Sequence, residues 1–572
     1  MPIASSTLIA SLLGATALAA LVPKAARRLA LSRAKHPSLA GHVRMAKRIA
    51  GWLPSYEFGE EDFFRSDDAT GEVAERRRLA FRRLSEQLRD RTTATRRLTA
   101  EAAGGISDLQ FTDRYRVPFP YRRLVNEALP LGTFVRSSEG PRLTDLDGNV
   151  AYDVSGSYGV NLFGYEFYKG ALAEAEREAH ALGPVLGPYH SVVADNVARL
   201  RAISGLDEVS FHMSGTEAVM QAVRLARYHT GRRRIVRFCG SYHGWWGDVQ
   251  PGIGNPIPAR DTLTLAEMSD RTLGVLAGRR DVACVLVNPL QALHPNAGAP
   301  ADSSLVDSSR RAGFDRAAYA DWLRRLREVC TARGIVLIFD EVFVGFRLAA
   351  GGAQEYFGTK ADLVTYGKSL GGGLPVGVLC GKAALMRRFR EDRPGDICFA
   401  RGTFNSHPYV MTAMNAFLRH LETPEVQALY RDLDACWDGR VARLNERLAE
   451  ERLPVRVAHL SSIWTIFYER PSRYNWMFQY YLRAEGLALS WVGTGRLIFS
   501  LDYGEADYTA VMDRFVAAAL RMERDGWWAG GLATNKDIRR RILRETIAAW
   551  RGRSGAGSRP QRGEELRPAP TP

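Results

Sequence analysis

Lys368 is the residue of this chain whose surroundings point most directly to chemistry. It follows an apolar run and precedes three glycines and a proline in YGKSLGGGLPVG, residues 366–377. An amine held in an apolar cleft between tight backbone turns is the kind of group that forms a Schiff base with a carbonyl. A nucleotide-binding loop is the alternative for a glycine-rich run, but such a loop places its lysine after the glycines. The order seen here favours a Schiff-base lysine.

Asp340 ends a second apolar run, IVLIFD at 335–340. Open α/β sheets bind ligands at the carboxyl ends of their strands, and a carboxylate buried at such a place needs a partner. A metal ion or a protonated ring nitrogen is the functional candidate. An ion pair with Arg347 is the structural alternative.

The third signal is SGTEA at 214–218, between a strand-like and a helix-like run. Backbone N–H groups at a helix N-terminus can wrap an anion, so Ser214, Gly215 and Thr216 could form a phosphate cradle. Serine and threonine before a helix also serve as simple caps, which is the alternative. Taken together, a phosphate cradle, a strand-end aspartate and a Schiff-base lysine meet the three binding needs of pyridoxal 5′-phosphate. The sequence therefore predicts this cofactor.

Four stretches carry a family resemblance: SGTEAVMQAVRLARYHTGRRRIVRFCGSYHG, LIFDEVFVGFR, DLVTYGKSLGGGLPVG and RGTFNSHP. In this order and spacing they resemble the class III pyridoxal-phosphate aminotransferases, and the branch they resemble most is glutamate-1-semialdehyde 2,1-aminomutase. The resemblance covers residues 120–525. It implies the α/β fold-type I architecture, with a large domain built on a seven-stranded, mostly parallel sheet. It also implies a small α/β domain from both chain ends and a homodimer.

The resemblance assigns roles to individual residues. It implies that Lys368 forms the Schiff base, that Asp340 partners the ring nitrogen, and that Tyr242 and Val342 pack on the two ring faces. The other cofactor-binding residues it implies are Ser214, Gly215, Thr216, His243 as part of the pocket wall, Gln291 near the ring hydroxyl and Thr403, which reaches the phosphate of the neighbouring subunit. The glutamate that opens the Gln291 motif in many relatives is Asn288 here.

The substrate pocket follows the resemblance less closely. Arg123 aligns with the arginine that holds the aminomutase substrate's carboxylate, and Ser157 and Tyr158 stand where the aminomutase has Ser-Trp. The acid that faces this arginine is replaced by Gly493. The stretch 475–500 instead resembles modules that act on β-keto acyl chains tethered to carrier proteins. We expect a transaminase that uses a small-molecule amino donor and a ketone or aldehyde acceptor. A long-chain or carrier-bound acyl group could carry that carbonyl, and an aminomutase is the alternative.

The elements that position these residues alternate between strands and helices. Apolar runs recur at 208–213, 234–238, 282–287, 335–340, 362–367 and 376–381, and a helix is expected over 215–230. Continuous apolar strands separated by helices predict a parallel sheet covered on both faces. We place the catalytic region at 111–525, with its large domain at about 175–415.

The two ends of the chain have a different character. Residues 3–22 contain no charged side chain and are followed by Lys24, Arg27 and Arg28, so a spanning helix, a peripheral membrane contact and a plain surface helix all remain open for the segment 1–33. Residues 34–110 predict a helical extension, with Leu79 and its apolar neighbours on one arginine-rich helix over 72–102. The segment 526–572 predicts a basic helix followed by a disordered tail from Ser554.

Charge and cysteine content narrow the class of protein. The net charge is +15; residues 1–110 hold 18 Lys and Arg against 12 Asp and Glu, and residues 536–572 hold 10 against 4. The middle is therefore near neutral and does not predict a nucleic-acid surface. The six cysteines contain no C-x-x-C pair and indicate reduced thiols of a cytoplasmic protein, with no metal site expected. A catalytically inactive partner-binding fold and a nucleic-acid binder with arginine-rich ends are the competing hypotheses, and intact Lys368, Asp340 and Tyr242 favour an enzyme.

Overall fold

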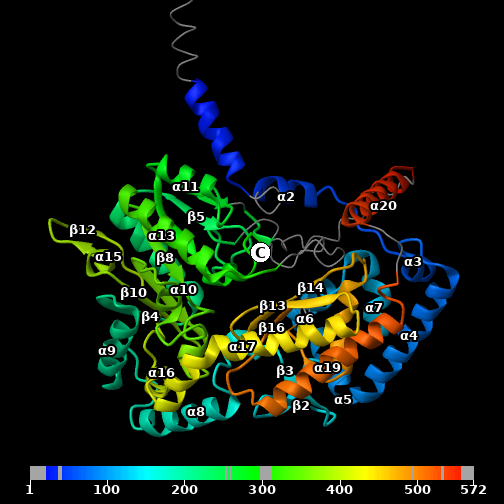
Figure 1. The fold of residues 1–572 in the computed structure, drawn as a ribbon. Coiled ribbons are helices and arrows are strands. Elements are labelled where there is room, and N and C mark those ends of the chain that lie inside the picture. Colours follow the sequence, from blue (N-terminus) through cyan, green and yellow to red (C-terminus); the bar gives the residue numbers. More distant parts are fainter. Residues whose placement is uncertain are drawn as a thin grey trace, which may run out of the picture.

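A seven-stranded sheet lies at the centre of the large domain in the computed structural model (Figure 1), which describes residues 21–35, 42–250, 254–257, 259–296, 312–490, 495–529 and 534–555. The strand order is β4-β10-β9-β8-β7-β5-β6. Six of these strands run in the same direction, and β10 runs in the opposite direction between β4 and β9. The mostly parallel sheet is thereby confirmed. The strands are β4 (Glu208–His212), β5 (Arg234–Phe238), β6 (Thr262–Leu265), β7 (Val282–Val287), β8 (Val336–Asp340), β9 (Leu363–Gly367) and β10 (Gly377–Gly381).

Register decides which side chains meet at the end of the sheet. Asp340 of β8 pairs with Thr365 of β9, so β9 continues for two residues beyond the level of Asp340 before the chain reaches Lys368. Strand β4 runs in the same direction as β9, because both are antiparallel to β10. The carboxyl ends of β4, β5, β7, β8 and β9 therefore share one edge, where α/β sheets bind ligands.

Helices cover both faces of this sheet, as the buried strands predict. Ile235 and Ile338 pack with the apolar face of α10 (Gly215–Thr230). Their chain neighbours Val236 and Leu337 point the other way and join the core that contains α9 (Val192–Ser204) and α13 (Arg316–Arg333). The period of two along each strand separates the two cores.

The small domain draws on both flanks of the large one. A four-stranded sheet joins β1 (Val135–Glu139), β2 (Arg142–Asp145) and β3 (Val150–Asp153) to β15 (Leu487–Ala488), which pairs in parallel with β3. A three-stranded sheet contains β13 (Val455–Leu460), β14 (Ile463–Tyr468) and β16 (Arg496–Ile498). Its helices are α17 (Pro424–Glu450), α18 (Phe478–Ala484) and α19 (Glu505–Arg524). The remaining elements are α8 (Tyr165–Ala179), α11 (Asp270–Ala277), α14 (Gly352–Phe357), α15 (Ala383–Met386), β11 (Phe389–Arg390), β12 (Arg393–Ile397) and α16 (Pro408–Leu421).

The N-terminal extension is helical, as expected. Residues 21–33 form a helix, followed by α2 (Val43–Ala50), α3 (Glu60–Arg65), α4 (Gly71–Arg91), α5 (Thr93–Ala103), α6 (Ser107–Tyr115) and α7 (Arg122–Ala128). The prediction of a single helix over 72–102 is wrong, because the helix is interrupted at Thr92, whose φ is −128° and ψ 38°. Leu79, expected on the buried face, is 46% exposed.

Arg77 takes the buried place on α4 that the sequence pattern gave to a leucine. Its guanidinium donates to the carbonyl oxygens of Phe64 (3.0 Å), Gly526 (2.8 Å) and Ala529 (2.6 Å). It also lies 4.5 Å from the centre of the Tyr474 ring. One buried cation thus joins the extension to the chain that follows α19.

The C-terminal basic helix is present as α20 (Asn535–Gly555), which extends over the first two residues of the tail predicted from Ser554. The rest of that predicted tail, 556–572, lies outside the described residues. Within the part of the chain that the structure describes, no helix combines the length and the apolar character needed to cross a membrane. The expectation for the uncharged run 3–22 falls mainly on residues 3–20, which are not described.

We predict that Arg77→Ala destabilises the protein by about 3 kcal/mol or more, because each buried carbonyl left without a donor costs about 1–3 kcal/mol. The matched control is the neighbouring Arg76→Ala. Arg76 is exposed and pairs only with Glu72 on the same helix, so its loss should change stability by less than about 0.5 kcal/mol. Urea unfolding of both variants measures the difference, and equal midpoints would show that Arg77 does not join the two ends.

Candidate functional site

The carboxyl edge of the sheet gathers the residues that the sequence singles out. Ser214 and Gly215 follow β4, the Tyr242–His243 pair follows β5, and Gln291 follows β7. Asp340 is the last residue of β8, and Lys368 comes directly after β9. Five parallel strands therefore deliver an anion cradle, an aromatic ring, a carboxylate and an amine to one place.

Asp340 is almost fully buried, at 4% exposure, and three donors hold its carboxylate. The Val342 N–H (3.2 Å) and the Thr365 hydroxyl (3.3 Å) donate to Oδ1. His243 Nδ1 lies 2.7 Å from Oδ2. A carboxylate only accepts hydrogen bonds, so the His243 proton must sit on Nδ1. The carboxylate is thereby fixed in orientation at the strand end.

His243 is buried behind Asp340, and burial lowers the pKa of its imidazole, although the bond to Asp340 acts in the opposite direction. Arg237 lies close enough to lower that pKa further. Arg237 is itself buried, has its own pKa lowered to about 10 by desolvation, and donates to Ser241. The lowered pKa favours a neutral His243 imidazole, with its single ring hydrogen on Nδ1, where it can donate to Asp340.

Lys368 adopts a left-handed backbone conformation with φ 48°, which is strained for a residue with a side chain. Burial lowers the pKa of its amine; Asp340 opposes this shift and Arg347 adds to it. Its Nζ lies 5.5 Å from the centre of the Phe343 ring. A buried amine with a lowered pKa is a stronger nucleophile at neutral pH than a surface lysine.

The short helical turn Gly156–Gly159 lies against Lys368. A Cβ on Gly159 would come within 3.4 Å of Lys368 Cδ and 2.7 Å of the Phe343 ring, so only glycine permits this approach. Ser157 and Tyr158 both have positive φ, and the Ser157 hydroxyl lies 2.9 Å from that of Tyr165. The structure thus places the turn that carries Ser157 and Tyr158 beside the lysine, and their role toward the substrate stays a prediction.

Arg347 binds the turn Gly156–Gly159 through backbone carbonyl oxygens. It donates to the carbonyl oxygens of Gly159 (3.3 Å) and Asn161 (2.9 Å). It also donates to the Ser462 hydroxyl (3.1 Å) and the Phe499 carbonyl (2.6 Å) of the small domain. Its partners are therefore neutral oxygens, and the ion pair with Asp340 that the sequence left open is not formed.

The turn before α10 has the geometry of an anion cradle. Ser214 is the N-cap: its hydroxyl accepts from the Glu217 N–H (3.2 Å), and the Glu217 carboxylate accepts from the Met213 N–H (2.9 Å). A Cβ on Gly215 would lie 2.5 Å from Val342 Cγ1. The Ser214 side chain thus caps the helix, while the absence of a side chain at Gly215 lets the start of α10 lie close to Val342.

Tyr242 and Gln291 flank the same edge. The Tyr242 ring is 61% exposed within one subunit, while its carbonyl accepts from Asn288 Nδ2 (3.1 Å). Asn288 also caps the following turn through the Leu290 N–H. Gln291 is 2% exposed, and its Oε1 has no hydrogen-bond donor among the residues described. A buried acceptor of this kind suits a ligand hydroxyl.

Two predicted residues lie elsewhere in a single subunit. Thr403 is exposed in the turn before α16. Arg123 is exposed on α7 and pairs with Glu57 (3.3 Å) and Glu127 (3.9 Å), so it is not among the side chains around Lys368. Their assigned roles stay predictions.

Sequence reasoning missed three contributors to the site. Thr365, Asn288 and Phe343 contact Asp340, the Tyr242 carbonyl and Lys368 respectively. Strand register could have pointed to Thr365, which stands opposite Asp340, whereas nothing in the sequence ranks Phe343 above its neighbours.

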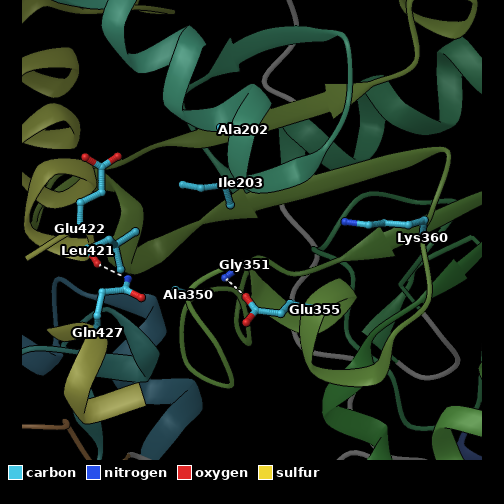
Figure 2. Close-up of a pocket in the computed structure, with 9 residues that line it drawn as sticks. All are labelled: Ala202, Ile203, Ala350, Gly351, Glu355, Lys360, Leu421, Glu422 and Gln427. Carbon is cyan, nitrogen blue, oxygen red and sulfur yellow. Dashed lines mark hydrogen bonds between the residues drawn. The ribbon is translucent and has the colours of Figure 1, made fainter. Parts of the chain in front are cut away.

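A separate cavity of about 400 Å³ lies away from these residues (Figure 2). Its lining comes from α9, α14 and the ends of α16 and α17, and consists of Ala202, Ile203, Ala350, Gly351, Glu355, Lys360, Leu421, Glu422 and Gln427. None of the predicted site residues lines it. We assign no chemistry to this cavity.

The residues at the sheet edge fit pyridoxal phosphate on their own chemistry. The end of α10 offers N–H groups to a phosphate, and the exposed Tyr242 ring offers a stacking face. Asp340 offers a held carboxylate to a ring nitrogen, Gln291 a buried acceptor, and Lys368 a buried amine to an aldehyde. Each binding need of the cofactor has a matching group.

We predict that Gly215→Ala weakens cofactor binding roughly tenfold or more, because its Cβ would overlap Val342 and overpacking costs about 1–3 kcal/mol. The matched control is Gly170→Ala in α8, where a Cβ meets nothing within 4 Å. The dissociation constant of pyridoxal phosphate from each apoenzyme measures the effect. Equal constants for Gly215→Ala and Gly170→Ala would contradict the proposed cradle.

Known proteins agree with this geometry. A glutamate-1-semialdehyde 2,1-aminomutase of Geotalea daltonii is 32% identical over 362 residues, covering 60% of this chain and 78% of that protein. A solved transaminase with pyridoxal phosphate bound is 25% identical, with a TM-score of 0.61 over 77% of this chain and 99% of that one. A β-phenylalanine aminotransferase of Variovorax paradoxus is 26% identical, with a TM-score of 0.60 over 78% of this chain and 96% of that one.

The family model for class III aminotransferases matches residues 125–249 and 279–518, which include every residue gathered at the sheet edge. The structural likeness extends to relatives that bind pyridoxal phosphate, the cofactor that the site fits. The chain belongs to the class III aminotransferases, enzymes of the fold-type I architecture that use pyridoxal phosphate.

Proposed function

We propose that this enzyme transfers an amino group from a small-molecule donor to a ketone or aldehyde on a long-chain or carrier-tethered acyl substrate. The observation that supports amino transfer is the arrangement of Lys368 and Asp340 at adjacent strand ends. Lys368 is buried with a lowered pKa, and Asp340 is held by Val342, Thr365 and His243. These are the two groups that the chemistry requires.

The protein residues divide the work. Bound pyridoxal phosphate supplies the carbonyl that captures the amine and a ring that withdraws electrons. We assign Asp340 to the ring nitrogen, whose protonated form a nearby carboxylate favours in a poorly solvated site. His243 and Thr365 keep that carboxylate oriented. Tyr242 and Val342 are assigned to the two ring faces, Ser214, Gly215 and Thr216 to the phosphate, and Gln291 to the ring hydroxyl.

Lys368 is the proposed acid–base group. Because burial lowers the pKa of its amine, a free Lys368 is ready to take a proton from the substrate carbon at neutral pH and to return it elsewhere. The turn Gly156–Gly159 and the Phe343 ring pack beside the lysine and limit where its amine can move. These neighbours therefore hold the Lys368 amine in position for proton transfer.

The identity of the acceptor rests on the sequence more than on the fold. Trp245, three residues after Tyr242, is 71% exposed and could contact the apolar chain of an acceptor. By contrast, Trp476 and Phe478 of the carrier-module-like stretch are core residues, and Trp491 and Gly493 lie outside the described residues. The exposed Trp245 is the structural support for a large acceptor.

An aminomutase is the second candidate, because relatives at 32–36% identity bear that name. Such an isomerase would act on a small substrate whose carboxylate needs a cation. The predicted cation, Arg123, is engaged by Glu57 and Glu127. This engagement favours transfer to another acceptor.

We further propose a cytoplasmic homodimer with a peripheral contact to the membrane through its N-terminus. Thr403 and Tyr242 are both exposed in one subunit, which suits the assigned contact of Thr403 with the cofactor of a second subunit. Within the described chain the cysteines are free thiols, which suits a reducing compartment.

Borohydride reduction tests the lysine assignment. We predict that reduction of the cofactor-loaded enzyme fixes the cofactor on the peptide that contains Lys368, and that Lys368→Ala abolishes both labelling and turnover. Lys360→Ala, a lysine outside the site, is the control and should keep both. Peptide mass spectrometry reads the label, and a label on another lysine would refute the assignment.

A chain-length series tests the acceptor. If the site accommodates a chain, kcat/KM for keto acceptors should rise by roughly fourfold per methylene, since each buried methylene contributes about 0.8 kcal/mol. The series is measured with free acids and with thioesters, against glutamate semialdehyde. Fast semialdehyde isomerisation with no trend along the series would replace transfer by the aminomutase alternative.

Complementation tests the shared site. Lys368→Ala and Thr403→Ala chains, each inactive alone, should regain roughly a quarter of wild-type activity when mixed, because a random heterodimer keeps one intact site of two. Mixing two batches of Lys368→Ala is the control. No recovery in demonstrated heterodimers would mean that Thr403 serves its own subunit.

A further inference from the structure

Three helices outside the catalytic region lie on one side of the molecule: residues 21–33, α2 and α20 (Figure 1). Every residue from Leu21 to Ala30 is exposed, including the apolar Leu21, Val22 and Leu29. This helix therefore projects from the body without burying its apolar side chains in it.

Helix α20 is attached to the body by ion pairs and leaves two apolar side chains exposed. Arg541 pairs with Asp67 and Asp68, and Glu545 pairs with Arg473, so ionic groups attach the helix to the body. Leu543 and Ile547, one turn apart on the helix, are exposed, at 59% and 39%. These two apolar side chains of α20 therefore face solvent and do not pack on the body.

Side-chain contacts bring further exposed apolar residues to the same region. The Tyr56 hydroxyl bonds with the side chains of Thr546 and Glu545, which places the exposed Trp52 and Leu53 near α20. Lys47 of α2 donates to the carbonyls of Asn255 and Pro256, next to the exposed Ile257. We call the set Met45, Trp52, Leu53, Ile257, Leu543 and Ile547 the apolar patch.

Basic residues lie beside the patch. Residues 1–56 hold eight Lys and Arg and no Asp or Glu. Among them, Arg44 and Arg48 of α2 are exposed beside Met45, and Arg540 and Arg544 follow the outward side of α20. Apolar side chains next to arginines suit a surface that has an apolar interior and an anionic outer layer.

We propose that the apolar patch and its arginines dock the enzyme on an anionic phospholipid bilayer. Tryptophan and leucine insert at the level of the headgroups while arginine side chains reach the phosphates, as in interfacial amphipathic helices. Each basic residue near an anionic bilayer contributes about a fivefold gain in binding. The contact is peripheral for the described helices, none of which is long and apolar enough to span a membrane.

The chemistry favours lipid over other partners. A nucleic acid would use the arginines but would leave Leu543, Ile547 and Leu53 in water. A second copy of the chain would have to bring two arginine-rich surfaces together at a self-complementary interface. Only an anionic lipid surface satisfies both the apolar and the basic components.

Vesicle co-sedimentation of the cofactor-loaded full-length enzyme tests the proposal. Binding is expected to phosphatidylcholine vesicles that contain one third phosphatidylglycerol, to weaken with salt, and to be lost on pure phosphatidylcholine. Arg44→Glu with Arg48→Glu should lower the partition coefficient at least about 25-fold, because two attractive charges are lost and two repulsive ones are added. Trp52→Ser with Leu543→Ser should lower it at least tenfold. Val135→Ser, which removes an equally exposed apolar side chain from β1, should leave it unchanged.

Unchanged turnover of a small acceptor in solution shows that each variant is folded and separates this proposal from the proposed function. Equal binding by wild type and both double variants would overturn the proposal. So would a change in oligomeric size without a change in vesicle binding, which would assign the patch to a second copy. Retention of duplex DNA by the wild type, lost in Arg44→Glu/Arg48→Glu without vesicle binding, would assign the arginines to nucleic acid.

Discussion

The hydrogen bonds that fix the Asp340 carboxylate are the constraint on which the site depends. A carboxylate buried at a strand end is tolerated only when donors replace the water it has lost, and here a backbone N–H, a hydroxyl and an imidazole do so. Each donor belongs to a different part of the fold. The loop after β5, strand β9 and the turn after β8 must therefore all be in place before the carboxylate is stable.

Much of this could be predicted from the sequence because local patterns determine it. The strand runs, the helix 215–230 and the order of SGTEA, Asp340 and Lys368 follow from hydrophobic period and glycine placement, and the structure has them at those positions. The seven-stranded sheet and the two-part small domain followed from the family resemblance.

The rest depends on contacts between residues distant in the chain. Thr365 meets Asp340 through strand register, and Asn288 holds the Tyr242 carbonyl across two loops. The break at Thr92 and the burial of Arg77 in place of Leu79 came from tertiary partners that helical period does not encode. The Asp340–Arg347 ion pair, which was the structural alternative for Asp340, is not formed, because Arg347 donates to four neutral oxygens.

Buried arginines connect the parts of this protein. Arg77 joins the N-terminal extension to the C-terminal end, Arg347 joins the active-site turn to the small domain, and Arg473 joins Asp67 to α20. Arginine suits this use because its planar fork reaches several carbonyls at once and stays charged. Part of the basic composition is therefore structural.

The protonation of His243 tests the account of Asp340 most directly. Nitrogen-15 NMR of histidine-labelled enzyme, with the signal assigned by its loss in His243→Asn, reports which ring nitrogen carries hydrogen. Because burial lowers the pKa of this imidazole, the account predicts a neutral ring at pH 7, with hydrogen on Nδ1 and none on Nε2. A doubly protonated ring at pH 7, or hydrogen on Nε2 alone, would contradict it, because Asp340 would then be neutralised or left without its donor.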